Sequence, residues 1–142
     1  MYTYQAFGDR YVLSLENHVE ITKALTMFCE GKQIKAGVIH GIGAVGKATL
    51  RFFAPHTKQY IDKTFQEQME IACLIGNISQ KEGKPYLHLH ITLGRSDYSA
   101  LAGHLLEATL SGAGEFVIEA FEGSLERYYN TSIGLNLYQL RK

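Results

Sequence analysis

The segment that decides the fold reads Leu87-His-Leu-His-Ile-Thr-Leu93. Successive side chains of a β-strand point to opposite faces, so this alternation predicts a half-buried strand. Its leucines and isoleucine are expected to pack against a core, whereas His88, His90 and Thr92 share the other face. An apolar face held by a core would fix the directions of both imidazoles.

This pair of histidines is a candidate for metal binding. Two residues along a strand span about 6–7 Å, which lets both imidazoles reach one ion. His104 is the third candidate ligand, because segment 96–103 is rich in small and polar residues that can turn the chain back, and Gly103 permits close approach. Three neutral imidazoles suit Zn²⁺ or another divalent first-row metal and leave a fourth position open for water or substrate.

The same residues allow a structural interpretation. His88 and His90 can line a polar sheet face, and His104 can cap a nearby turn. Spacing alone does not decide between this structural role and a metal site.

Glu107 and Glu70 are weak catalytic candidates, since either could act as general base on a metal-bound water, and either could equally be solvated or ion-paired.

Other polar residues are expected to serve structural or surface roles. Such roles are expected for His18, His56 and His40. Of these, His40 is the strongest candidate for another role, because a glycine-rich segment follows it. Arg10 and Arg127 could form salt bridges or contact an anion, and nothing local separates these roles.

The glycine-rich segment Gly41-Ile-Gly-Ala-Val-Gly46 satisfies a dinucleotide-binding pattern after an apparent strand. That chemistry requires a following helix to meet a pyrophosphate, and residues 47–53 instead resemble another strand. We interpret the glycines as a tight turn between two strands.

The remaining elements predict an α+β fold: a mainly antiparallel sheet with one principal helix packed on it. The helix is expected to begin at Asn17 in a capping-box-like arrangement, with His18 in its first turn, and to end at Gly31. Its apolar stripe is expected to consist of Ile21, Ala24, Leu25 and Phe28, which follow helical spacing. A hairpin is expected around Gly8-Asp9-Arg10 and a turn at residues 81–84. The pattern at 101–110 fits either a helix or a strand. Strands are expected at residues 2–7, 11–15, 36–40, 48–53, 68–79, 86–93, 116–121 and 132–140.

Composition is that of an ordinary globular protein of one domain, residues 1–142. Apolar residues make up 46% and charged residues 20% of the chain, and 14 basic residues balance 14 acidic ones. This balance disfavours unaided tight binding to nucleic acid.

Cys29 and Cys73 both lie in apolar patterns and are expected to be reduced core thiols. No secretion signal or apolar membrane span is visible, so a cytoplasmic protein without membrane association is expected.

Three ordered motifs resemble the PPC (plants-and-prokaryotes-conserved) domain family. They are Gly37-Val-Ile-His-Gly-Ile-Gly-Ala-Val, Glu70-Ile-Ala-Cys-Leu-Ile-Gly-Asn-Ile, and Leu87-His-Leu-His followed by Ala102-Gly-His-Leu. The resemblance implies an α+β fold, a homotrimer, and a metal site at His88, His90 and His104. Ala102 replaces the first glycine of the family's Gly-Gly-His pattern, a small change in backbone freedom.

The resemblance implies two functions. Plant members are DNA-associated and bacterial members are described as candidate DNA-binding proteins, which suggests a DNA-associated or regulatory binding module. The AT-hook through which plant members enter the minor groove is absent from this sequence. The family is also distantly similar to acetolactate decarboxylase, which suggests the alternative of a zinc-dependent lyase or hydrolase acting on a small-molecule ligand.

Overall fold

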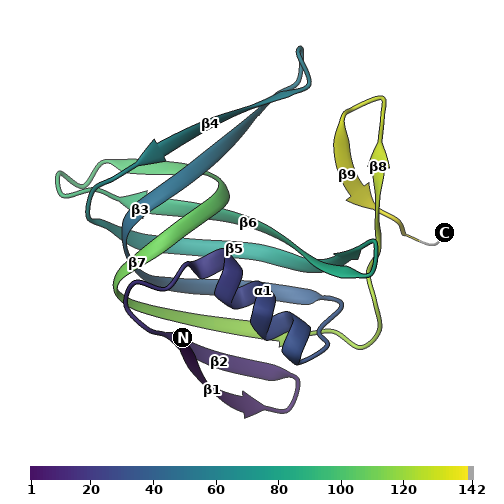
Figure 1. The fold of residues 1–142 in the computed structure, drawn as a ribbon, viewed down its shortest axis with the longest axis horizontal. Coiled ribbons are helices and arrows are strands. Elements are labelled where there is room, and N and C mark those ends of the chain that lie inside the picture. The colour runs from purple at the N-terminus through teal and green to yellow at the C-terminus, as the bar shows by residue number, and fades with distance from the viewer. Residues whose placement is uncertain (141–142) are drawn as a thin grey trace.

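The computed structural model describes residues 1–140, which form nine strands and one helix (Figure 1). All ladders between strands are antiparallel, and the expected α+β class is confirmed. The elements are β1 (Tyr2–Phe7), β2 (Arg10–Leu15), α1 (Ile21–Gly31), β3 (Gly37–Ala54), β4 (Gln59–Phe65), β5 (Met69–Lys81), β6 (Lys84–Gly94), β7 (Ala100–Ala120), β8 (Arg127–Asn130) and β9 (Leu135–Tyr138).

Two long strands organise the main sheet. Its order is β1-β2-β7-β6-β5-β3-β4, and β7 pairs additionally with β3. The pairings β3–β5, β5–β6, β6–β7 and β7–β3 therefore return to their starting strand, so these four strands form a closed circuit of hydrogen-bonded neighbours. The short hairpin β8–β9 forms a separate sheet beside the main one (Figure 1).

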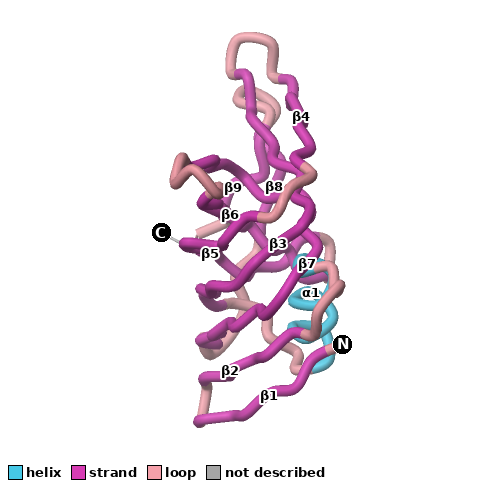
Figure 2. The backbone as a smooth tube through the Cα atoms, turned by 90° about the vertical axis from the view of Figure 1, so that its left-hand side faces the viewer, coloured by secondary structure: helices cyan, strands magenta, loops and turns pink. Residues whose placement is uncertain are grey.

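The helix α1 lies along one side of the stacked strands (Figure 2). With 11 residues it is too short to cross a bilayer, and residues 1–140 contain no other α-helix. The expected apolar stripe is confirmed, since Ile21, Ala24, Leu25, Phe28 and Cys29 are all buried. They join inward-facing strand residues such as Leu13, Ile39, Leu74, Leu89, Ile91 and Phe116 in one core.

The start of the helix differs from the prediction. Glu20, not Asn17, is the N-cap: its carboxylate accepts from the backbone N–H of Thr22 and Lys23 and also from Ala108 in β7. Asn17 instead accepts from the backbone N–H of Gly112. His18, predicted in the first helical turn, precedes the helix with φ of 65°. Both predictions were wrong because contacts with β7, distant in sequence, determine where the helix begins.

The glycine-rich segment was also predicted incorrectly. Residues 41–46 do not turn but continue through β3, whose register shifts between Gly41 and Gly43 and again between Gly43 and Val45. A side chain at Gly41 would lie 2.7 Å from the Glu115 carbonyl oxygen and would collide with the Phe116 ring. These glycines therefore allow β7 to lie against a long, irregular strand.

The remaining predicted elements agree with the structure at some positions and differ at others. The first hairpin and the turn at residues 81–84 are confirmed, and the undecided stretch 101–110 lies in strand β7. The exposed strand β4 was not predicted, and the last predicted strand shortens to β9 because residues 131–134 form a turn. Cys29 is buried as expected, whereas Cys73 is exposed because a register shift after Ile71 interrupts the alternation of β5.

The close approach at Gly41 predicts a large stability cost for a single added methyl group. We expect Gly41→Ala to lower the free energy of unfolding by about 1–3 kcal/mol, because the β3–β7 ladder or the Phe116 ring must move. Gly31→Ala is the matched control, since a side chain there meets nothing within 4 Å. Urea unfolding followed by circular dichroism measures both, and equal stability of the two variants would contradict the prediction.

Candidate metal centre

The predicted histidine face of residues 87–93 is present in β6. Leu89, Ile91 and Leu93 are buried, while His88 and His90 point to the opposite face. His104 lies on β7 directly opposite His90, because β6 and β7 pair through this register. A turn at residues 95–99, in which the Arg95 backbone N–H donates to the Ser99 carbonyl at 2.8 Å, brings the chain back as expected.

The structure thus brings His88, His90 and His104 together. Their ring centroids lie 5.0–5.5 Å apart, and one possible ligand nitrogen from each lies within 4.8 Å of the others. The Nε2 atoms of His88 and His90 are 3.3 Å apart, a hydrogen bond in which either ring can donate. Three imidazole nitrogens this close match the donor set that zinc and neighbouring first-row ions prefer.

The surroundings favour the neutral imidazoles that bind metals. Burial lowers the pKa of His104 to about 4, with smaller contributions from His88, His90 and Arg51. Burial is also the main reason why the pKa of His88 is lowered, and the charges of His90 and Arg127 act in the same direction. Both groups are therefore neutral at pH 7 and can coordinate an ion without first losing a proton.

A cavity of about 490 Å³ opens beside the three histidines. Its walls come from the β3–β4 hairpin and from the β8–β9 hairpin, which both extend beyond the sheet at the top of Figure 1. Besides the histidines, seven of the wall residues are aromatic or aliphatic, and they give the cavity a largely apolar lining. They are Phe52, Phe53, Tyr60, Tyr86, Leu135, Leu137 and Tyr138.

Arg51 lies on β3 directly opposite His104. Its Nε and Nη2 atoms donate to the two carboxylate oxygens of Asp62 at 2.7 and 2.8 Å. These bonds hold the pKa of Asp62 below its usual range, and the guanidinium also lies 4.6 Å from the centre of the Tyr60 ring. The charge of Arg51 is therefore already balanced inside the protein.

Arg127 on β8 has different partners. Its Nε atom donates to Ser79 Oγ at 2.7 Å and its Nη1 atom to the carbonyl oxygen of Asn136 at 3.0 Å. The guanidinium lies over the rings of Tyr138 and Tyr86, at 4.1 and 4.9 Å from their centres. In the described part of the chain no carboxylate forms a salt bridge with it, whereas Arg10 pairs with Glu119.

The two carboxylates predicted near the metal lie elsewhere. Glu107 accepts from Lys47 at 2.9 Å and from Thr49 at 3.1 Å, and these bonds lower its pKa. Glu70 pairs in register with Gly94, at the other end of β5 from Asn77, which lines the cavity. Neither glutamate lines the cavity.

The expected close approach at Gly103 is also absent, because a side chain there would meet Leu50 and Arg51 only at ordinary contact distances of 3.7–3.8 Å. The other histidines stay apart from the cluster: His18 and His56 lie in connecting segments, and His40 lies on β3. Of the cavity residues missed from sequence, Tyr86 could have been found, because it continues the alternation of His88 and His90. Arg51 depends on strand pairing that no local pattern reveals.

Several solved structures resemble the chain over nearly its whole length. A candidate DNA-binding protein from Bacteroides thetaiotaomicron is 59% identical, with a TM-score of 0.96, covering 98% of this chain and 97% of the other. A metal-containing protein from Archaeoglobus fulgidus is 30% identical, with a TM-score of 0.86 and 99% of each chain covered. A plant- and prokaryote-conserved (PPC) protein from Pyrococcus horikoshii is 28% identical, with a TM-score of 0.85, covering 100% and 96%.

None of the curated proteins compared with the chain matches it significantly. The family profile of the Plants and Prokaryotes Conserved domain matches residues 2–122. This match and the 59% identity to the Bacteroides protein agree with the closed β3–β5–β6–β7 circuit and its single helix. The chain therefore belongs to the Plants and Prokaryotes Conserved domain family, abbreviated PCC or PPC.

Proposed function

We propose that this protein is a metal-centred binding module, in which His88, His90 and His104 hold one Zn²⁺ or another divalent first-row ion. The observation that carries the proposal is the approach of three imidazole nitrogens to within 4.8 Å of one another beside a cavity. The metal-containing relative from Archaeoglobus fulgidus supports it. Three protein ligands leave a coordination position for a small molecule, which can enter from the cavity.

A binding role fits the cavity better than a lyase or hydrolase reaction. Carboxylate-assisted acid–base catalysis on a bound ligand needs an Asp or Glu within hydrogen-bond reach of that ligand. Within residues 1–140, no Asp or Glu lines the cavity, and the nearby Asp62 is held by the Nε and Nη2 atoms of Arg51. The metal would therefore orient and polarise a ligand, while the apolar walls exclude water around it.

Metal analysis of protein purified without a polyhistidine tag tests this site. We expect about one equivalent of divalent metal per chain, and a loss of affinity of more than ~100-fold in the double variant His88→Ala/His90→Ala, because two of three ligands disappear. His56→Ala is the matched control, since His56 lies in the exposed turn between β3 and β4, outside the cluster, and its replacement should leave the metal content unchanged. Equal metal in wild type and double variant would refute the site.

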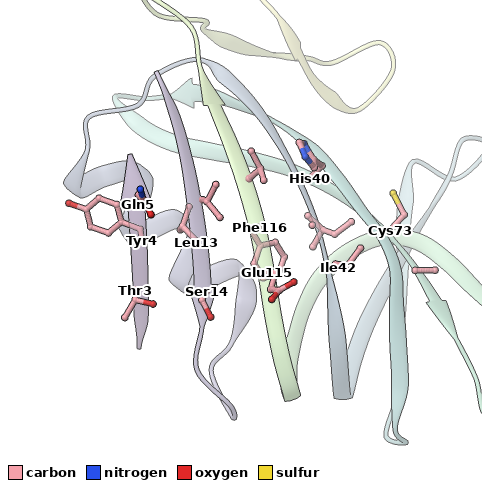
Figure 3. Close-up of a pocket in the computed structure, with 15 residues that line it drawn as sticks. Thr3, Tyr4, Gln5, Leu13, Ser14, His40, Ile42, Cys73, Glu115 and Phe116 are labelled. Atoms are coloured by element: carbon pink, nitrogen blue, oxygen red, sulfur yellow. The ribbon is translucent and has the colours of Figure 1, made fainter. Parts of the chain in front are cut away.

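We further propose that the module is a homotrimer assembled through the outer face of the sheet. Residues directly opposite in antiparallel strands share a face, so the ladders define one continuous row on that face. The row runs His104, His90, Ile75, His40, Val117, Val12 and Gln5. A second cavity, of about 770 Å³, lies on this face, where His40, Ile42, Cys73 and Glu115 are visible (Figure 3).

Exposed apolar side chains on this face favour its burial between copies. Ile42 and Ile75 are 56% and 59% exposed, and Val12 is 44% exposed. Apolar residues that gather on one surface commonly mark an interface. Because the row also contains His90 and His104, an interface on this face would adjoin the proposed metal site.

Sedimentation equilibrium tests the assembly. We expect a species with about three times the 15.9 kDa chain mass and a smaller species for Ile42→Lys, since a charge buried between copies is costly. Ile133→Lys, at a similarly exposed isoleucine in the turn before β9, should stay trimeric. A monomeric wild-type protein would contradict the proposal.

DNA association is a second candidate function, favoured by the Bacteroides relative described as a candidate DNA-binding protein. The equal numbers of basic and acidic residues predict that any such contact is weak or needs a partner. A mobility-shift titration with duplex DNA at ~0.15 M salt tests whether the protein associates with DNA. A dissociation constant below ~0.1 mM, the weak end of the range for non-specific binding, would support this function, and weaker binding would count against it.

A further inference from the structure

The cavity beside the histidines contains a guanidinium whose orientation is set by the protein. The rings of Tyr138 and Tyr86 lie against Arg127, and its Nε and Nη1 atoms donate to Ser79 and Asn136. Its Nη2 group has no hydrogen-bond acceptor within residues 1–140. The protein thus holds a planar donor group in position and leaves one end of it available.

Charge balance around the cavity points to an anionic ligand. Arg51 is neutralised by its two bonds to Asp62, so Arg127 is the cation of the lining without a carboxylate partner in the described chain. A divalent ion on the histidines would add further positive charge. A cavity with apolar walls and a positive interior attracts anions more strongly than an open surface does.

The positions of Arg127 and the histidines also limit the ligand's size. Tyr86, which lies beneath the Arg127 guanidinium, and His88 are two residues apart on the same face of β6, or about 6–7 Å along the strand. The guanidinium and the three imidazoles therefore flank one compartment. Phe53, Tyr60 and Leu137 provide apolar wall, and a volume of about 490 Å³ suits a small molecule.

We propose that the cavity binds a small organic acid: Arg127 holds a carboxylate, and a second oxygen of the ligand coordinates the ion on His88, His90 and His104. This inference rests on the proposed metal site and adds the chemical class of its ligand. The available Nη2 group of Arg127 can donate to a carboxylate, and such charge-assisted bonds are among the strongest in proteins.

Calorimetric titration of the zinc-loaded protein with glutarate tests the inference, with its neutral diamide, glutaramide, as the matched comparison. We expect glutarate to bind at least ~tenfold more tightly than glutaramide and more tightly than inorganic phosphate. Arg127→Gln should weaken glutarate at least ~tenfold while zinc content and glutaramide affinity stay unchanged. Arg10→Gln is the control, because this exposed arginine pairs with Glu119 away from the cavity.

Equal affinity for glutarate and glutaramide, tighter binding of phosphate, or an unaltered Arg127→Gln variant would overturn the inference while leaving the metal site intact. Arg127 begins β8 and bonds to Asn136 of β9, so if Arg127→Gln unfolds this hairpin, the wild-type comparison of acid and diamide decides alone. A wild-type protein that takes up no zinc would refute the proposed function separately. In that case the metal-free protein would still test the contact between Arg127 and a carboxylate, through its preference for glutarate over glutaramide.

Discussion

The antiparallel ladder between β3 and β7 is the constraint on which the rest of the structure depends. It extends from Gly37 opposite Ala120 to Arg51 opposite His104, with three register shifts along the way. At one end β7 also pairs with β2, and at the other with β6, so a single strand connects the N-terminal hairpin to the histidine strand. Without this ladder His104 would have no fixed position relative to His90.

The irregularities of this ladder have a physical cause. Two strands of 18 and 21 residues cannot follow each other as flat ribbons, because strands twist and the twist accumulates with length. Extra residues at bulges relieve that strain, and glycine is favoured where backbones approach as closely as at Gly41 and Gly43. The glycine-rich segment 41–46, which matches a nucleotide-binding pattern, thus serves the close packing of β3 against β7.

The same architecture gives the two arginines of the cavity different electrostatic roles. β4 runs beside β3 and supplies Asp62, so Arg51 is neutralised within its own hairpin. Arg127 comes from a separate small sheet and meets a hydroxyl, a carbonyl and two aromatic rings. Two residues of one type in one cavity therefore differ in the charge that they offer to a ligand, which explains why the proposed ligand contact is assigned to Arg127.

Local patterns alone determined part of this protein. The alternation of residues 87–93 placed both histidines opposite the buried leucines, and the spacing from Ile21 to Phe28 determined the buried side of α1. These predictions succeed because the periods of strand and helix are properties of the backbone itself. The start of the helix, the continuity of β3 and the exposure of Cys73 were decided instead by contacts with distant strands.

Only the tertiary structure placed His104 opposite His90, balanced Arg51 with Asp62 and set Arg127 over Tyr86. Register between strands far apart in the sequence depends on the packing of the whole sheet, which no single segment encodes. The sequence by itself therefore determined which face of β6 carries the histidines, while the tertiary structure decided what surrounds them.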